Sequence, residues 1–246
     1  MQHNLPTHLL VLTIALFLAP IGCGGDTEDP GVPPASVGGG GDNEVAPETG
    51  GEFVPATINQ EPQTGVSPAT AAPKEPAAPE VAIKTNLGTI VVQLNPKKAP
   101  VTVDNFIANY VEQKAYDGTI FHYVEAGVMA CAGGYDTQLK ARSTRGEIYN
   151  EAHSGLKNKK GTIAMARHPD YVNSATSQFF FNLADNPSLD HVGTGEGQEY
   201  GYCVFGQIIR GMDVLEKINS APVANNGDFI NVTSPAVVIE SITRIK

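Results

Sequence analysis

Histidine and cysteine are the side chains of this sequence most able to bind a metal ion, and the chain has six histidines and three cysteines. Zinc sites take three or four such ligands, usually at short and regular spacings. None of the six histidines falls at a spacing of that kind, and three cysteines do not complete a site. The sequence therefore predicts no metal centre.

Two of the cysteines, Cys131 and Cys203, lie in the apolar C-terminal part of the chain and raise a question of redox state. Unpaired thiols are uncommon in proteins of oxidising compartments. A Cys131–Cys203 disulfide and two buried free thiols are the alternatives. Sequence spacing alone does not choose between them.

The net charge of −10 is unevenly distributed along the 246 residues. Residues 1–80 carry one Lys and ten Asp or Glu, whereas residues 81–246 carry 15 basic and 16 acidic side chains. A protein that binds nucleic acid needs a basic surface that displaces counterions from the phosphates. The nearly neutral C-terminal part therefore argues against a nucleic-acid partner.

The segment 1–23 is typical of a secretory signal. A mainly apolar run extends from Leu9 to Ala19, and small residues precede Cys23. A membrane-spanning helix needs about 20 apolar residues, so this shorter run fits the apolar region of a signal peptide better than an anchor helix. The residues before Cys23 resemble a bacterial lipoprotein cleavage box. We expect an extracytoplasmic protein, in the periplasm or cell envelope, lipidated on Cys23; the alternative is an ordinary signal peptide with an incidental cysteine.

The segment 24–80 has the composition of a linker. It contains ten Pro and ten Gly, interleaved with Ala, Glu and Thr. Such a segment cannot bury enough apolar surface to offset the entropy lost on ordering. The sequence therefore predicts a disordered tether of residues 24–80, followed by one folded domain of residues 81–246.

The pattern changes at Val81. Residues 81–85 and 89–94 alternate partly in the two-residue period of strands around a turn at 86–88, which predicts a β-hairpin. Apolar residues at 103, 106, 107, 110 and 111 share one helical face, which predicts a helix from Val101 to Gln113 with Thr102 as its N-cap. Strands outnumber helices, which predicts a closed or nearly closed antiparallel barrel with helices at its ends. The further expected elements are strands Ile120–Val124, Thr162–Ala166, Gln178–Asn182, Tyr202–Ile208 and Ala236–Ile245, and a helix Met212–Ile218.

Six blocks of this domain resemble, in order and spacing, the signature blocks of cyclophilins. The resemblance covers Val81 to Lys246 and looks most like the bacterial, single-domain members. The six blocks are Phe121-His122-Tyr123-Val124, Gly133-Gly134, Gly161 to Ala166, Ser177 to Phe180, Tyr202 to Gly206, and Gly211 to Leu215.

The resemblance implies a mainly β fold, in which a closed eight-stranded antiparallel barrel is capped by two α-helices and binds proline-containing peptides in an outer groove. The implied reaction is cis–trans isomerisation of X-Pro bonds, with no cofactor. Uncatalysed, this rotation faces a barrier of about 18–20 kcal/mol. The enzyme would hold the proline ring in an apolar pocket while donors hydrogen-bond groups whose charge changes as amide resonance is lost.

The resemblance also implies the residues of that groove. Gln178 occupies the position of the glutamine that hydrogen-bonds the substrate backbone, and Ala166 that of the small residue that lets the peptide approach. His122 is expected to be structural. The other groove positions are the pocket walls Met129, Phe180 and Leu189, the adjoining subsite residues Arg167 and His168, and Tyr202, where many members have His.

This chain departs from the family pattern where the chemistry occurs. Tyr123 replaces the arginine credited with hydrogen-bonding the proline nitrogen, and Cys131 replaces the glutamine that supports that arginine. Val128 replaces an aromatic pocket wall, and Ser188 replaces an aromatic residue before Leu189. A guanidinium supplies several charge-assisted donors, whereas a phenol supplies one neutral donor. We therefore expect weak or absent turnover.

Arg167 has two possible positions. It could lean toward the substrate in place of the missing arginine, or lie as a solvated side chain on the groove rim, and the second is the expected state.

Two functions remain open at this point. One is an extracytoplasmic folding catalyst that acts on X-Pro bonds of envelope or secreted proteins, and the other is a non-catalytic module, tethered to the membrane, that binds proline-containing peptides. In both, the membrane is reached only through the lipid anchor and the chain is expected to be a monomer. The resemblance places Cys131 toward the groove and Cys203 away from it, which favours two free thiols over the disulfide.

Overall fold

The structure is a computed structural model that describes residues 78–193 and 197–246. The predicted signal peptide, Cys23 and nearly all of the predicted linker lie outside these residues. In the part of the chain that is described, no helix combines the length and the apolar character needed to cross a membrane.

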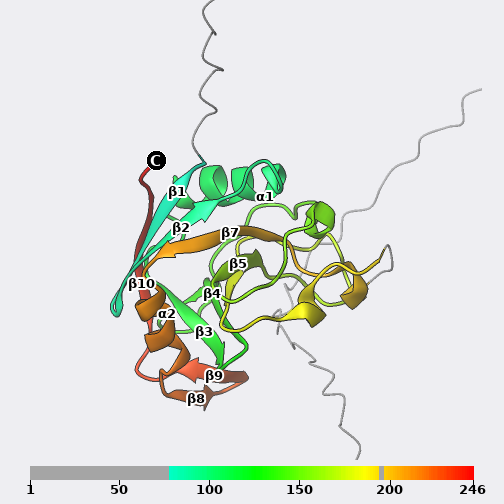
Figure 1. The fold of residues 1–246 in the computed structure, drawn as a ribbon. Coiled ribbons are helices and arrows are strands. Elements are labelled where there is room, and N and C mark those ends of the chain that lie inside the picture. The colour runs from blue at the N-terminus through cyan, green and yellow to red at the C-terminus, as the bar shows by residue number, and fades with distance from the viewer. Residues whose placement is uncertain (1–77, 194–196) are drawn as a thin grey trace, which may run out of the picture. The chain divides into compact units, whose positions relative to one another are not determined.

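Eight antiparallel strands close into a barrel, as expected from the resemblance (Figure 1). The strands follow one another around the barrel in the order β1, β10, β3, β4, β6, β5, β7 and β2, so the C-terminal strand lies between β1 and β3. They are β1 (Glu80–Thr85), β2 (Gly88–Leu94), β3 (Thr119–Glu125), β4 (Met129–Asp136), β5 (Thr162–Met165), β6 (Phe179–Asn182), β7 (Val204–Arg210) and β10 (Val238–Arg244).

The predicted N-terminal hairpin is confirmed as β1 and β2, which pair with Ile83 opposite Ile90. Val81 and Ile83 are fully buried, whereas Lys84 is exposed. This alternation is the pattern of a strand with one face toward the barrel interior and one toward water.

The first helical segment begins with α1 (Pro100–Asp104) and continues as the π-helix η1 (Asn105–Val111). All five residues of the predicted apolar face are buried in the barrel core. The ring of Phe106 lies in edge contact with the ring of Phe179, with centroids 5.7 Å apart. The predicted helix is therefore confirmed, apart from its last two residues.

The prediction of Thr102 as the N-cap was wrong. The helix begins two residues earlier, and the carboxylate of Glu151 caps it from outside the helix. Its Oε1 accepts a hydrogen bond from the backbone N–H of Val101 at 3.1 Å, and its Oε2 accepts bonds from the N–H and Oγ1 of Thr102 at 2.8 Å and 2.7 Å. A distant carboxylate thus satisfies the free N–H groups that a local side chain usually satisfies.

The second predicted helix is confirmed as α2 (Met212–Asn219), whose Val214, Leu215 and Ile218 are buried in the core. It packs closely against the turn at the start of β2. A Cβ atom at Gly88 would lie 2.7 Å from Cγ2 of Val214, and Gly88 has a φ of +134°. Glycine is therefore needed there both for space and for backbone conformation.

The strand prediction missed β4 and a small hairpin outside the barrel, made of β8 (Val223–Asn226) and β9 (Phe229–Thr233). β4 contains Gly133-Gly134, a pair that is typical of a turn in sequence. The described residues also form short 3-10 helices, η2 (Ala152–Ser154), η3 (Pro187–Leu189) and η4 (Gly197–Tyr200).

The three consecutive phenylalanines of β6 divide between the two faces of the barrel wall. Phe179 and Phe181 belong to the core inside the barrel, whereas Phe180 belongs to a second apolar cluster on the outside. This alternation follows from the two-residue period of a strand. It gives the barrel an apolar outer face at this strand, and the candidate site lies there.

Candidate functional site

A β-bulge in β3 presents Tyr123 on the outer face of the barrel. Phe121 pairs with Ala132 and Tyr123 pairs with Cys131, so two positions of β3 advance against one of β4. Phe121 and Val124 both belong to the interior core, which leaves two residues between them where regular alternation would leave one. Bulges of this kind re-aim side chains next to functional sites.

The outer cluster brings together most of the predicted groove residues. Met129, Phe180 and Leu189, the three predicted pocket walls, all belong to it, together with Tyr123 and Val128. The remaining members are Cys131, Ala164, Ala166, Tyr202, Val204 and Leu156. Residues far apart in the sequence, from several neighbouring strands and the η3 segment, therefore supply one apolar surface.

The three predicted pocket walls lie together, but their side chains are almost completely covered. Met129 and Phe180 are each 1 % exposed and Leu189 is 6 % exposed, whereas Tyr123 and Val128 are half-buried. A prolyl ring can contact Met129 or Phe180 only after a neighbouring side chain moves. In this conformation the ligand-accessible part of the outer cluster is made by its half-buried members.

The η3 segment is held against the cluster by backbone and side-chain hydrogen bonds. The amide of Asn158 donates to the carbonyl of Leu189 at 2.9 Å, and the N–H of Tyr202 donates to the same carbonyl at 2.9 Å. The amide of Asn186 donates to the carbonyl of Val128 at 2.9 Å. Ser188 is exposed and is not part of the cluster.

Tyr123 donates its hydroxyl proton to a carboxylate. Its Oη lies 2.8 Å from Oε2 of Glu125, two residues further along β3. Burial of the phenol, followed by this hydrogen bond and the negative charge of Glu125, raises the pKa of Tyr123 well above its ordinary value, and the neighbouring side chain of Asn231 opposes the shift. A phenol has a single proton to donate. While that proton is held by Glu125, Tyr123 has no donor left for a substrate.

The thiol of Cys131 lies in the same environment. Burial and the charge of Glu125 raise the pKa of Cys131 to about 12. The thiol is 3.8 Å from the sulfur of Met129. It is therefore protonated at neutral pH and contributes an apolar surface to the cluster.

Gln178 lies beside the cluster and not within it. It packs on Gly134, where a Cβ atom would lie 2.6 Å from Cδ of Gln178, so the second glycine of the Gly-Gly block makes room for this side chain. Oε1 of Gln178 and Nδ1 of His122 are both buried without a hydrogen-bond partner in the described part of the chain. The N–H of Ala166 donates to the carbonyl of Gln178 at 2.9 Å.

Burial lowers the pKa of His122 to about 4, although the backbone at Ile120 and the side chain of Gln178 act in the opposite direction. The imidazole is therefore neutral at physiological pH. Its ring lies in edge contact with Tyr135, with centroids 4.9 Å apart. These contacts agree with the expected structural role of His122.

Arg167 does not lie on the groove rim, and the expectation of a solvated side chain was wrong. The residue is 2 % exposed. Its guanidinium donates hydrogen bonds to the carbonyls of Gly201, His168, Pro169 and Gly197, at 3.0, 2.9, 3.0 and 2.6 Å. The carbon Cζ lies 4.7 Å from the centre of the Tyr202 ring. Arg167 thus holds the loop that leads to Tyr202, and its donors are not aimed at a substrate.

His168 lies next to Arg167 outside the cluster and is half-buried. Its Nδ1 accepts a hydrogen bond from the N–H of Asp170 at 3.2 Å, and its ring packs against Tyr171 with centroids 4.8 Å apart. Its contacts are therefore with its own loop.

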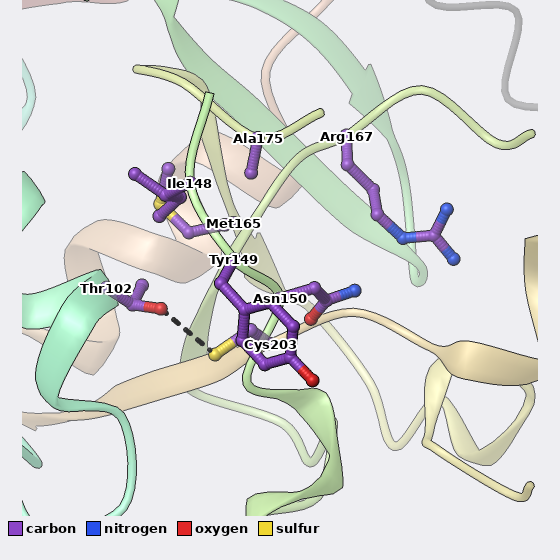
Figure 2. A pocket seen from close by; sticks show the side chains of 8 residues that line it. All are labelled: Thr102, Ile148, Tyr149, Asn150, Met165, Arg167, Ala175 and Cys203. Carbon is purple, nitrogen blue, oxygen red and sulfur yellow. Dashed lines mark hydrogen bonds between the residues drawn. The ribbon is translucent and has the colours of Figure 1, made fainter. Parts of the chain in front are cut away.

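A hollow separate from the outer cluster lies between the start of α1 and the segment 148–150, and Figure 2 shows the eight side chains that line it. Cys203 lies here, with its sulfur 3.4 Å from Oγ1 of Thr102. Burial raises the pKa of Cys203 to about 11. Cys131 belongs to the outer cluster and Cys203 to the interior core, and both are free thiols. The expectation of two free thiols is therefore confirmed, and the disulfide does not form.

Residues 80–244 match the family described as cyclophilin type peptidyl-prolyl cis-trans isomerase/CLD. The chain belongs to the cyclophilin family. The match spans the entire barrel, from β1 to β10. The residues of the outer cluster all lie within the matched range.

Curated relatives among bacterial cyclophilins are similar over most of their length. Peptidyl-prolyl cis-trans isomerase A of Dickeya dadantii is 44 % identical over 184 residues, which cover 74 % of this chain and 92 % of the relative. The peptidyl-prolyl cis-trans isomerase of Acinetobacter baylyi is 46 % identical over 66 % of this chain and 83 % of its own. Peptidyl-prolyl cis-trans isomerase B of Escherichia coli is 43 % identical over 66 % of this chain and 98 % of its own.

Solved structures support the fold. A crystal structure of a cyclophilin type peptidyl-prolyl cis-trans isomerase of Cryptosporidium parvum aligns with a TM-score of 0.54 and 23 % identity, and covers 69 % of this chain and 98 % of that one. A second structure of that protein, obtained in the presence of the dipeptide Ala-Pro, aligns with a TM-score of 0.55 and 23 % identity over 68 % of this chain and 99 % of that one.

Two residues that neighbour Tyr123, Glu125 and Asn231, were not among the residues predicted from the sequence. Glu125 could have been found, because it lies two positions after Tyr123 on the same strand and so was a candidate for the same face. Asn231 had no such signal. It comes from β9, far along the chain from Tyr123, in a hairpin that the sequence pattern did not predict.

Proposed function

We propose that this cyclophilin catalyses cis–trans isomerisation of X-Pro bonds in extracytoplasmic proteins, at a rate well below that of members that carry the arginine. Membership of the family and the grouping of Met129, Phe180 and Leu189 in one cluster support the isomerase function. The slow rate is supported by the hydrogen bond between Tyr123 and Glu125, which is the observation that carries this part of the proposal.

Isomerisation requires stabilisation of a twisted amide in which the proline nitrogen regains a lone pair. Donors aimed at that nitrogen act only when they are free and already in place. The single hydroxyl proton of Tyr123 is donated to Glu125. Loss of one preorganised donor typically costs on the order of 10²–10³ in rate.

The covered pocket is a second reason for slow turnover. A prolyl ring must displace a neighbouring side chain before it contacts Met129 or Phe180, which are both 1 % exposed. Part of the binding free energy is then spent on opening the pocket. We expect weak affinity for short peptides as a result.

Exchange NMR on a short peptide containing one Ala-Pro bond tests the function directly. The full-length protein should raise the exchange rate between the cis and trans peptide signals above the uncatalysed rate. A variant that combines Met129→Gly with Leu189→Gly is the control, because it lacks two pocket walls. Equal exchange rates with and without the intact protein would contradict the isomerase proposal.

The second candidate is a binding module without turnover. It is favoured by the charge of the site, because a phenol bound to the carboxylate of Glu125 stands where the family pattern provides a guanidinium. The same NMR experiment separates the two functions. Peptide signals that shift on addition of protein, with no gain in cis–trans exchange, would favour the binding module.

The extracytoplasmic location and the lipid anchor rest on residues 1–23. We expect the full-length protein, expressed in a bacterium, to fractionate with membranes and to lose this behaviour in a Cys23→Ser variant. If the Cys23→Ser variant stays with the membranes, the lipid anchor is excluded. If neither protein is exported, the proposed location is excluded.

A further inference from the structure

Glu125 places a carboxylate at the edge of the outer cluster. It is the last residue of β3 and pairs with Met129 in the β3–β4 register. The N–H of Val128 donates to the carbonyl of Glu125 at 2.9 Å, so a tight turn holds the backbone of Glu125 close to Val128 and Met129. Gly127, with a φ of +75°, allows that turn.

Only one oxygen of this carboxylate is occupied. Oε2 accepts the hydrogen bond from Tyr123, while Oε1 accepts none from the described residues. No Lys, Arg or His in the described part of the chain forms an ion pair with Glu125. The N–H of Gly127 donates to Asn219, whose amide donates in turn to Glu216. The last residue in this series of contacts is Lys160, whose Nζ lies 2.6 Å from Oε1 of Glu216. Its ammonium is therefore paired with Glu216.

The neighbours of Glu125 at the site carry no compensating charge. Tyr123 and Cys131 are both neutral, since their pKa values are raised in part by the charge of Glu125. The side chain of Asn231 is an amide and carries no charge. Arg167 donates its hydrogen bonds to backbone carbonyls, including those of Gly197 and Gly201 in the loop that leads to Tyr202. The groove therefore has a negative centre where the family pattern has a positive one.

We propose that Glu125 selects peptides that carry a cation, the side chain of Lys or Arg, directly beside the proline. This proposal rests on the proposed function, because it concerns the same groove. A cation there pairs with the free Oε1 and neutralises a half-buried carboxylate, whereas an acidic residue is repelled. Ion pairs at partly exposed positions of this kind give roughly a five-fold preference in affinity, which falls as salt screens the charges.

Two peptide series of matched size provide the test, acetyl-Ala-X-Pro-Phe-amide and acetyl-Ala-Pro-X-Phe-amide, with Lys, Gln or Glu at X. The Kd of each peptide is measured by NMR titration of the full-length protein at low and at high salt. In at least one series, the Lys peptide should bind roughly five-fold more tightly than the Gln peptide, and the Glu peptide most weakly. High salt should reduce the difference.

The Glu125→Gln variant keeps the shape of the side chain and removes its charge, so the Lys preference should disappear. Glu112→Gln is the matched control, because Glu112 is an exposed carboxylate at the end of η1. It should keep the full preference. Equal binding of all three peptides in both series, or a Lys preference that survives Glu125→Gln, overturns the selectivity and leaves the proposed function intact. If no peptide binds, the proposed function itself fails.

Discussion

Tyr123 and Cys131 lie directly opposite one another across β3 and β4. They are the two positions at which this cyclophilin lacks the arginine and the supporting glutamine of the family pattern. Because the pair meets at one point of the sheet, both changes alter a single local site. The thiol cannot orient a guanidinium, and the phenol does not need such support because Glu125 holds it.

Restoring the missing pair should raise turnover. We expect Tyr123→Arg combined with Cys131→Gln to increase the rate of cis–trans exchange by about 10²-fold, in line with the effect of one preorganised donor. Exchange NMR on the Ala-Pro peptide measures the gain.

The same variant also tests the influence of Glu125. A guanidinium at position 123 would pair with this carboxylate, so adding Glu125→Gln to the double variant should raise the rate further. Cys131→Gln alone is the control and should give no gain. If the triple variant is no faster than the natural protein, the missing arginine is not what limits turnover.

Arg167 should contribute to stability more than to catalysis. Replacing it with Ala leaves four carbonyl groups without their donor, and charge-assisted hydrogen bonds of this kind contribute about 1.5–3 kcal/mol each before relaxation. We expect Arg167→Ala to lower the free energy of unfolding by about 3 kcal/mol, measured by urea denaturation. Arg210→Ala removes an exposed arginine and should change it by less than about 0.5 kcal/mol.

A catalytic role of Arg167 would predict that Arg167→Ala loses turnover, whereas the structural role predicts that the folded variant keeps it. At low temperature and without denaturant, the folded Arg167→Ala protein should keep the exchange rate of the natural protein on a per-folded-molecule basis. A loss of turnover with unchanged stability would place Arg167 in the mechanism.

The barrel was predictable from the sequence because its strands follow regular patterns. The alternation in β1, where Val81 and Ile83 are buried, and the helical face from Val103 to Val111 each reflect a single buried side, and both were confirmed. β4 escaped prediction because Gly133 and Gly134 are turn residues by composition. Here they serve packing: a Cβ atom at Gly133 would lie 2.8 Å from the ring of Tyr116.

The site was less predictable than the fold, because its contacts are set by tertiary structure. The family pattern led to Met129, Phe180 and Leu189, but no periodicity indicates that they are covered. The position of Arg167 depends on carbonyls of a loop that lies far along the chain, near Gly201. The cap of α1 depends in the same way on a distant carboxylate, which local capping rules cannot identify.

Glu151 should be a major source of stability. Its carboxylate is buried and accepts three hydrogen bonds at the start of α1. We expect Glu151→Ala to lower the free energy of unfolding by about 2–4 kcal/mol, because capping and buried charge-assisted bonds are lost together. Urea denaturation followed by circular dichroism measures the effect.

Two further variants identify the cause. Glu151→Gln keeps one acceptor and should cost about half as much, while Glu147→Gln at an exposed position should cost almost nothing. Equal costs for Glu151→Ala and Glu147→Gln would show that the carboxylate does not stabilise the helix.

His122 should make the stability of the domain depend on pH. Its pKa falls from 6.5 in the unfolded chain to about 4 in the folded protein, chiefly because of burial. Between these values the unfolded state binds more protons, so stability falls as pH falls below about 6.5. At about 1.4 kcal/mol per pH unit, the loss attributable to His122 should reach about 2 kcal/mol at pH 5.

Urea unfolding at pH 7.5, 6 and 5 measures this dependence. The free energy of unfolding should change less steeply with pH in His122→Gln than in the natural protein. His153→Gln, which replaces an exposed imidazole, is the control. If the free energy of unfolding changes equally with pH in His122→Gln and in the natural protein, protonation of His122 is not the cause of the lost stability.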